Sequence, residues 1–323
     1  MTRDTTIKIS YYFCAAVLLA VAWMKLSTPL ITILFSYLIL CHLRVGKRRW
    51  PAILLFLIIV SLVFYGFVYF IRESITTLPH VAETSIPILI SYAKSWNIDL
   101  PFSDLESLQH LTVDALSEQL QYFARFAEFA TKEFVFLIIG LVVAISIFVN
   151  GNLDLNQGNY KEPNNLYTLV CDEISKRFAS IFRSFETVMG AQLVISAINT
   201  TFTAIFLLVA GLPYAKLLVI LTFVVGLLPI VGNLLSNTII CGVALTKSPQ
   251  LAAASLVYLI VLHKVEYFLN SKIIGGRIKN PMWLTLLGLL LGERLMGIPG
   301  MILAPVILHF VKTECSQVSV RIN

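Results

Sequence analysis

Residues 217–245 read LLVILTFVVGLLPIVGNLLSNTIICGVAL, an apolar segment that is interrupted at its midpoint. The interrupting residues weaken a helix or cost free energy to bury, and they are Pro229, Gly232, Asn233, Ser236 and Asn237. A membrane-spanning helix needs about 20 apolar residues, so a segment of ~30 residues is too long for one span and too short for two. We therefore expect a re-entrant helical hairpin over 215–246, with its tip inside the membrane.

The composition places the whole chain in a membrane. Of its 323 residues, 58% are hydrophobic and 13% are charged, whereas soluble domains average about 25% charged residues. The net charge of +6 comes from basic residues that cluster in short loops between apolar segments. That distribution is typical of cytoplasmic loops and not of a nucleic-acid interface. We predict an all-α polytopic membrane protein with about 6–8 membrane segments and no nucleic-acid partner.

The basic cluster RVGKRRW (44–50) fixes the expected topology. The positive-inside rule places it in the cytoplasm, and two short apolar stretches, 11–24 and 28–43, precede it. If both of them cross the membrane, the amino terminus is cytoplasmic, and counting the later segments makes the carboxy terminus cytoplasmic too. The predicted regions are amino-terminal spans in 1–72, an extracytoplasmic region 73–133, a span 134–149, a cytoplasmic loop and helix 150–189, a transport core 190–312 and a tail 313–323.

Two of these regions are predicted to be amphipathic. Region 73–133 is acidic, and Ser103 to Glu106 has the form of a capping box before a helical pattern of apolar residues. Apolar residues also recur with helical spacing over 166–189, which predicts an interfacial helix that continues into a span over 190–210. The loop at 150–165 does not match the spacing of a calcium-binding loop.

A second broken segment occupies 282–311, after a predicted span over 250–270. Its break, GERLMGIPG (292–300), contains Gly292, Gly297, Pro299 and Gly300, which permit a tight reversal, and Glu293 and Arg294, which either pair, mark a gate or are solvated. The topology makes the two hairpins enter from opposite faces. Two full hairpins of short spans with deep loops would fit the charge distribution equally well. A pair of Gly/Pro-interrupted hydrophobic segments points to a transporter binding site.

The first break offers groups that bind a polar solute. A half-helix beginning near Gly232 or Asn233 would direct its positive end inward, and one ending near Leu228 would offer carbonyls to a cation. Asn233, Ser236 and Asn237 either contribute to that site or serve only helix packing.

A second group, His263, Glu266 and Asn270, shares one helix face. An intramembrane carboxylate is costly, which makes Glu266 a candidate for ion coupling, unless it only balances Lys264, Lys272 or Arg277 at an interface. No enzyme fingerprint occurs in the chain, and its histidines do not cluster with cysteines, so we expect no enzyme activity, cofactor or metal site.

Three stretches of the carboxy-terminal half have the form of known family motifs: GLLPIVGN (226–233), VEYFLNSKIIGGRIKNPMWLTLLGLLLG (265–292) and LMGIPGMILAPVI (295–307). Through them this half resembles the AI-2E (autoinducer-2 exporter) family of bacterial transporters, also described as PerM-type permeases. Carried over position by position, the family motifs fall on Pro229, Gly232, Glu266, Gly275, Pro281, Gly297, Gly300 and Pro305. The resemblance implies structural roles for Gly275, Pro281 and Pro305.

The resemblance also implies a function. It implies a bacterial inner-membrane secondary transporter without ATPase parts, whose family has been linked to export of autoinducer-2 and to sodium or lithium efflux against protons. We therefore expect a homo-oligomer in the lipid bilayer that exports a small polar solute or a monovalent cation in exchange for protons or sodium. Two other hypotheses remain open: a passive oligomeric pore lined by the same breaks, and an envelope scaffold that binds partners through 73–133.

Overall fold

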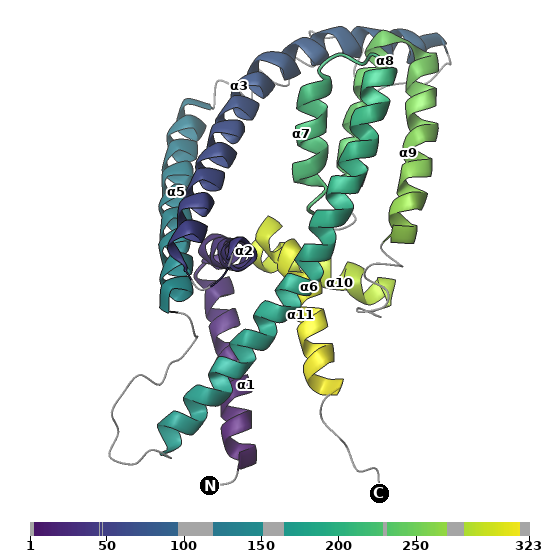
Figure 1. The fold of residues 1–323 in the computed structure, drawn as a ribbon. Coiled ribbons are helices and arrows are strands. Elements are labelled where there is room, and N and C mark those ends of the chain that lie inside the picture. Colours follow the sequence, from purple (N-terminus) through teal and green to yellow (C-terminus); the bar gives the residue numbers. More distant parts are fainter. Residues whose placement is uncertain are drawn as a thin grey trace, which may run out of the picture. The chain divides into compact units, whose positions relative to one another are not determined.

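The structure is a computed structural model that describes residues 3–44, 46, 48–95, 119–150, 165–228, 231–269 and 281–316. These residues form helices and no strand, which confirms the all-α prediction (Figure 1). The helices are α1 (Arg3–Trp23), α2 (Ser27–Leu43), α3 (Trp50–Ser95), α5 (Gln119–Asn150), α6 (Leu166–Val209), α7 (Ala215–Val225), α8 (Val231–Lys247), α9 (Pro249–Leu269), α10 (Met282–Met296) and α11 (Ile298–Ser316).

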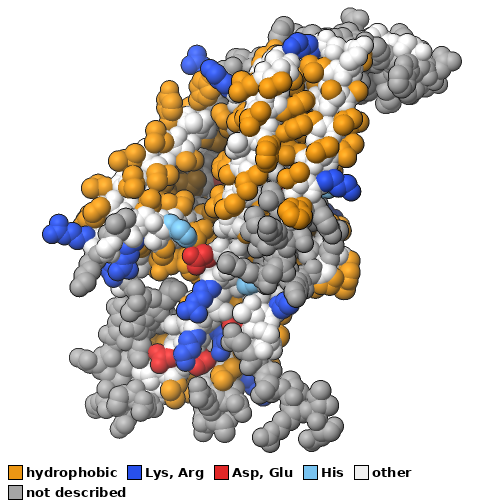
Figure 2. Space-filling model, turned by 45° about the vertical axis from the view of Figure 1, so that its right-hand side comes forward, with side chains coloured by type: hydrophobic (Ala, Val, Ile, Leu, Met, Phe, Trp, Pro, Cys, Tyr) orange, Lys and Arg blue, Asp and Glu red, His pale blue; other side chains and the backbone are white. Residues whose placement is uncertain are grey.

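Several helices are long and apolar enough to cross a membrane. Within the described part of the chain they are Thr5–Trp23, Trp50–Tyr69, Thr131–Asn150, Leu166–Val209 and Ile298–Ser316. Apolar side chains cover much of the surface in Figure 2, and many of them are exposed, such as Leu208 at 73% and Val209 at 84%. A surface of this kind is typical of contact with lipid or with other apolar partners. The prediction of a polytopic membrane protein is therefore confirmed.

Helix α6 joins two regions that we predicted separately. Its 44 residues run without interruption through the expected junction at 189–190, where Gly190 is tolerated in mid-helix. At 1.5 Å per residue the helix is about 66 Å long, twice the ~30 Å hydrocarbon core, so roughly half of it lies beyond that core. Its charged residues all precede Ala191, and the division into an interfacial first half and a spanning second half stays a prediction.

Other predicted regions meet the structure only in part. The expected span 250–270 corresponds to α9. Judged by the length and hydropathy of its described residues, α9 is not among the candidate membrane spans. Helix α11 extends to Ser316 and at 19 residues is long enough to cross, whereas we expected half-segments too short to do so. The capping box at 103–106 and most of the loop 150–165 lie outside the described residues, and the region boundaries remain predictions.

The chain divides into two compact units. The first comprises Met1–Val60, Lys132–Ala191 and Ile278–Asn323, and the second comprises Ser61–Thr131 and Gln192–Arg277. In the first unit, Phe185 and Met189 of α6 pack against Leu38 of α2 and Val306 of α11. A neighbouring cluster joins α2, α3 and α5 through Leu40, Phe56 and Phe148. Burial of these large side chains ties segments from both ends of the sequence together.

The second broken segment forms the α10–α11 hairpin within the first unit. The chain reverses at Gly297, whose φ of +64° lies in the region that favours glycine. On either side of the turn, the backbones of Gly292 and Gly300 touch. A Cβ atom added to Gly300 would lie 1.9 Å from the carbonyl oxygen of Gly292. Both glycines therefore serve close helix packing, and Pro305 is buried in the interior of α11.

Replacing Gly300 by alanine is expected to lower the stability of the first unit by about 3 kcal/mol, because the added methyl group meets backbone atoms that cannot change rotamer. Thermal unfolding of the purified protein in detergent measures the effect. Gly66→Ala in α3 is the matched control, since its added Cβ would have no atom within 4 Å. Equal unfolding temperatures of the two variants would contradict the close packing of α10 on α11.

The second unit contains the other broken segment. Helices α7, α8 and α9 run side by side (Figure 1) and share an apolar core with the end of α6, in which Leu207, Leu218, Ile240 and Leu259 are almost completely buried. At the end of α6, the Lys247 ammonium group donates hydrogen bonds to the carbonyl oxygens of Ala210 and Gly211, at 3.1 and 2.9 Å. A cation is favourable at this carboxy-terminal end of a helix.

Candidate functional site

The break between α7 and α8 depends on a glycine. Helix α7 ends at Val225 and α8 begins at Val231, while Pro229 and Ile230 lie outside the described residues. A Cβ atom on Gly232 would lie 1.9 Å from the carbonyl oxygen of Val225. No side chain fits there, so Gly232 allows the first turn of α8 to lie against the end of α7.

The backbone at the end of α7 is satisfied by side chains of α6. The Gln192 amide donates a hydrogen bond of 2.8 Å to the carbonyl oxygen of Gly226, and the Ser196 hydroxyl donates one of 2.8 Å to that of Phe223. Unpaired carbonyls at membrane depth are costly, and these bonds remove that cost. We expected free carbonyls at this end as cation ligands, but at these two positions they are already bonded.

Glu266 is buried beside the start of α8. Its residue is only 5% exposed, and its carboxylate lies next to the Asn233 side chain in the first turn of α8. The Nδ1 atom of His263 lies 3.5 Å from a carboxylate oxygen of Glu266. The positive end of the α8 dipole favours a negative charge at this position. Three of the predicted site residues are thus brought together by α8 and α9.

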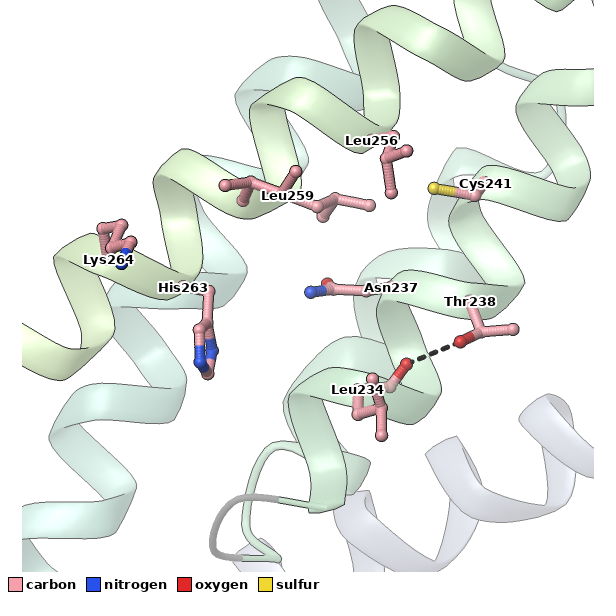
Figure 3. A pocket seen from close by; sticks show the side chains of 9 residues that line it. Leu234, Asn237, Thr238, Cys241, Leu256, Leu259, His263 and Lys264 are labelled. Atoms are coloured by element: carbon pink, nitrogen blue, oxygen red, sulfur yellow. Dashed lines mark hydrogen bonds between the residues drawn. The ribbon is translucent and has the colours of Figure 1, made fainter.

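Ser236 and Asn237 have different surroundings. Ser236 is fully buried, and its hydroxyl donates a hydrogen bond of 3.2 Å to the carbonyl oxygen of Asn233. Asn237 lines a groove of about 680 Å³ between α8 and α9, which is within the usual size range of ligand pockets. In Figure 3 the side chains of Asn237 and His263 extend into this groove from opposite helices, and its other walls are largely apolar.

The remaining predicted residues are not part of this group. Asn270 and Gly275 lie outside the described residues, and Pro281 precedes the first residue of α10. The glycines of the 292–300 break and Pro299 belong to the α10–α11 hairpin in the other unit. Glu293 and Arg294 are both exposed, and these two described side chains form no ion pair with each other. Their predicted roles as gate or solute-site residues remain predictions.

Sequence reasoning overlooked the polar face of α6. Gln192, Ser196, Asn199 and Thr203 are each no more than 6% exposed. Their spacing of four, three and four residues places them on one side of a helix. The signal was therefore present in the sequence within the predicted span 190–210.

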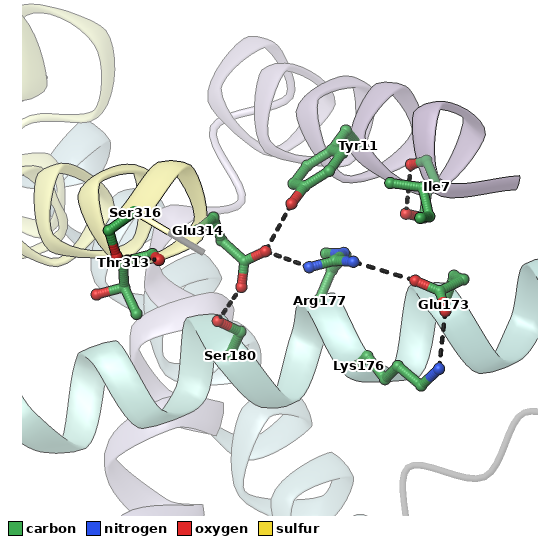
Figure 4. Close-up of polar contacts among 10 residues, drawn as sticks. Ile7, Tyr11, Glu173, Lys176, Arg177, Ser180, Thr313, Glu314 and Ser316 are labelled. Carbon is green, nitrogen blue, oxygen red and sulfur yellow. Dashed lines mark hydrogen bonds and ion pairs between the residues drawn. The ribbon is translucent and has the colours of Figure 1, made fainter. Parts of the chain in front are cut away.

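A second overlooked feature is a buried ionic cluster in the first unit, shown in Figure 4. The Glu314 carboxylate of α11 accepts hydrogen bonds from Tyr11 of α1, at 2.6 Å, and from Ser180 and Arg177 of α6. Arg177 also pairs with Glu173 at 3.0 Å. This ionic cluster, Tyr11, Glu173, Arg177, Ser180 and Glu314, joins three helices that are distant in the sequence. No local pattern could have indicated it, since Arg177 and Glu314 are 137 residues apart.

Comparison with known proteins identifies the family. The family model described as "AI-2E family transporter" matches residues 7–318, nearly the whole chain. The chain belongs to the AI-2E transporter family. In Bacillus subtilis (strain 168), "Putative transport protein YdbI" is 24% identical over 278 residues, which cover 83% of this chain and 76% of the relative. "Putative transport protein YueF" from the same strain is 31% identical over 137 residues, 41% of this chain and 37% of the relative.

Membership of the AI-2E family confirms the resemblance and identifies a multi-pass membrane transport protein, in a family of transporters and not of enzymes. The three stretches that carried the resemblance fall on the α7–α8 connection, on the segment from α9 to α10 and on the α10–α11 turn. In the part of the chain that the structure describes, no group of three or more histidine, cysteine, aspartate or glutamate side chains is arranged to hold a metal ion.

Proposed function

We propose that this AI-2E family protein is an inner-membrane secondary transporter. It exports a small polar solute or a monovalent cation, coupled to the proton or sodium gradient, and Glu266 is the coupling carboxylate. The observation that carries the proposal is the burial of Glu266 between α8 and α9, where it lies next to Asn233 and close to His263.

The partners of Glu266 distinguish it from a structural carboxylate. Glu314, which is equally buried, is paired with the permanently charged guanidinium group of Arg177. The described partners of Glu266 are a neutral amide and a histidine, which is charged only when it is protonated. Among the described residues no permanently charged group pairs with Glu266, and a buried carboxylate in that state is neutralised by binding a proton or a metal cation. That reversible step is the one that a coupled transporter requires.

The surroundings of Glu266 supply the rest of the proposed site. Gly232 allows the end of α7 to lie against α8. Asn237 and His263 extend into the groove between α8 and α9. In the proposed cycle, the break between α7 and α8 in the second unit binds the solute, and the site is exposed alternately to the two sides of the membrane. The 292–300 break in the first unit is proposed as a gate. The amino and carboxy termini are proposed to be cytoplasmic and the protein to be a homo-oligomer.

Flux into reconstituted liposomes tests the proposal. With an imposed proton gradient, we measure transport of sodium, lithium and autoinducer-2 by the wild type and by Glu266→Gln. We expect Glu266→Gln to lower the coupled flux of the transported species at least about tenfold, a change of ~1.4 kcal/mol in the barrier. Glu186→Gln is the matched control, because Glu186 is half-exposed and lies 4.0 Å from His42 in the other unit.

The same assay separates the proposal from a passive pore. Coupled flux collapses when an uncoupler removes the proton gradient, whereas flux through a pore does not depend on that gradient. Unchanged flux of every tested solute in Glu266→Gln would sink the coupling role of this carboxylate.

A further inference from the structure

The second half of α6 carries a buried polar face on a helix whose opposite side is largely apolar and exposed. The polar face consists of Gln192, Ser196, Asn199 and Thr203, which lie within about 60° of one another at 100° per residue. Side chains elsewhere on the same helix, such as Val194 and Phe202, are about half-exposed. The polar face therefore points into the second unit, and the opposite, largely apolar side points outward.

The two ends of this polar face differ in their hydrogen bonding. Gln192 and Ser196 are bonded to the carboxy-terminal carbonyls of α7. In contrast, Asn199 Oδ1 and Thr203 Oγ1 have no hydrogen-bond partner among the described residues, although Asn199 is 2% exposed and Thr203 is fully buried. A buried polar atom without a partner costs free energy, and natural proteins usually satisfy it with water or a ligand.

An unsatisfied hydroxyl group on α9 also indicates that water or a ligand binds in this region. The ring of Tyr258 stacks on that of Phe206, with 4.1 Å between the ring centroids, one turn of α6 beyond Thr203. The Tyr258 hydroxyl also lacks a partner within the described part of the chain. Unsatisfied oxygen atoms therefore occur on both helices of this packed pair. All of these groups are uncharged, so they match hydroxyl groups better than an anion.

We propose that Asn199 and Thr203 bind hydroxyl groups and form a hydrated track along α6 inside the second unit. The hydroxyl groups come either from water or from a neutral hydroxylated solute. The track goes beyond the proposed coupling site because none of its residues touches Glu266 in the contacts described above. It rests on the proposed function only for its use in transport, and its hydration is a separate property.

Cysteine accessibility tests the hydration directly. In lipid vesicles, we react Asn199→Cys and Thr203→Cys with a small charged methanethiosulfonate reagent and measure labelling of each peptide by mass spectrometry. Two neighbours are matched controls: Leu207→Cys, fully buried in the apolar core, and Leu208→Cys, 73% exposed on an apolar face. We expect labelling at positions 199 and 203 to be at least tenfold faster than at both controls. Labelling as slow as at Leu207→Cys would overturn the proposal.

A second measurement identifies the source of the hydroxyl groups. Glycerol, a small neutral polyol, is added during labelling, and the exposed native Cys315 serves as the internal reference. If labelling at positions 199 and 203 slows while labelling of Cys315 does not, the track binds solute hydroxyl groups. Labelling that is fast and insensitive to glycerol assigns the track to water.

Flux measurements then separate the track from the coupling site. Thr203→Val removes the hydroxyl group at nearly constant volume and is expected to lower flux at least threefold, whereas Thr203→Ser keeps the hydroxyl and is expected to retain flux. Unchanged flux in Thr203→Val would overturn the role of the track in transport. Fast labelling together with full flux in Glu266→Gln would leave the track intact and remove the coupling role. Slow labelling together with impaired flux in Glu266→Gln would remove the track and leave the coupling role intact.

Discussion

Replacing Arg177 by alanine is expected to lower the free energy of unfolding by about 3–5 kcal/mol, because it breaks a buried ion pair. Arg177 lies between Glu173 and Glu314, and its side chain is only 14% exposed. Its removal leaves two buried carboxylates without their shared counter-charge. It also takes away the guanidinium group that lies 4.5 Å from the centre of the Tyr11 ring, and with it a contact between α1 and α6.

Lys176→Ala is the matched control for this prediction. Lys176 pairs with the same Glu173, at 2.7 Å, but its side chain is 60% exposed. Ion pairs exposed to solvent contribute about 0–1 kcal/mol, so we expect an unfolding temperature close to that of the wild type. Thermal unfolding in detergent measures both variants. An equal loss of stability in Arg177→Ala and Lys176→Ala would show that the stability depends on positive charge along this helix and not on the buried ionic cluster.

Gly232→Ala is expected to disrupt the α7–α8 connection and abolish transport. The added methyl group would lie 1.9 Å from the carbonyl oxygen of Val225 and 2.7 Å from its carbonyl carbon. Both are backbone atoms, so α8 has to move away from α7 and carry Asn233 away from Glu266. We expect a loss of at least about 3 kcal/mol in stability, measured by thermal unfolding, and loss of flux in the liposome assay.

Gly242→Ala tests whether the effect is local. Gly242 lies in the same helix, and a Cβ atom added there would have no atom within 4 Å. Replacement of an unconstrained helical glycine by alanine stabilises by about 0.5–1 kcal/mol. We therefore expect normal flux and an equal or higher unfolding temperature. If Gly232→Ala behaved in the same way, the close approach of α7 and α8 would be refuted.

Much of the fold could be predicted because a bilayer imposes simple length rules. Apolar runs of about 20 residues, bounded by charged loops, marked most of the helices that can cross. The rules failed where composition changes without a break. The charged residues of α6 all lie before Ala191, and we divided the segment there into an interfacial helix and a span. Nothing at that position interrupts the backbone hydrogen bonds of α6. Length also misled us at α11, where the helix continues through mostly polar residues to Ser316, past the apolar segment that we assigned.

The candidate site was predictable to the extent that its contacts are local. His263 and Glu266 are three residues apart on one helix, so spacing alone placed them together. The proximity of Asn233 to Glu266 depends on the packing of α8 against α9, which the sequence does not specify. The ionic cluster around Arg177 depends on three helices from distant parts of the chain. For the polar face of α6 the spacing was visible, but small uncharged residues resemble ordinary helix-packing positions in a membrane.

Helix α7 also has a consequence for how the protein is made. Its 11 residues extend about 16 Å, roughly half of the hydrocarbon thickness, so it cannot be released into lipid alone. The groups that satisfy its last carbonyls, Gln192 and Ser196, precede their partners by 34 and 27 residues and leave the ribosome first. We therefore expect α6 to wait at the insertion machinery until α7 and α8 emerge, and the three helices to enter the bilayer as one assembly.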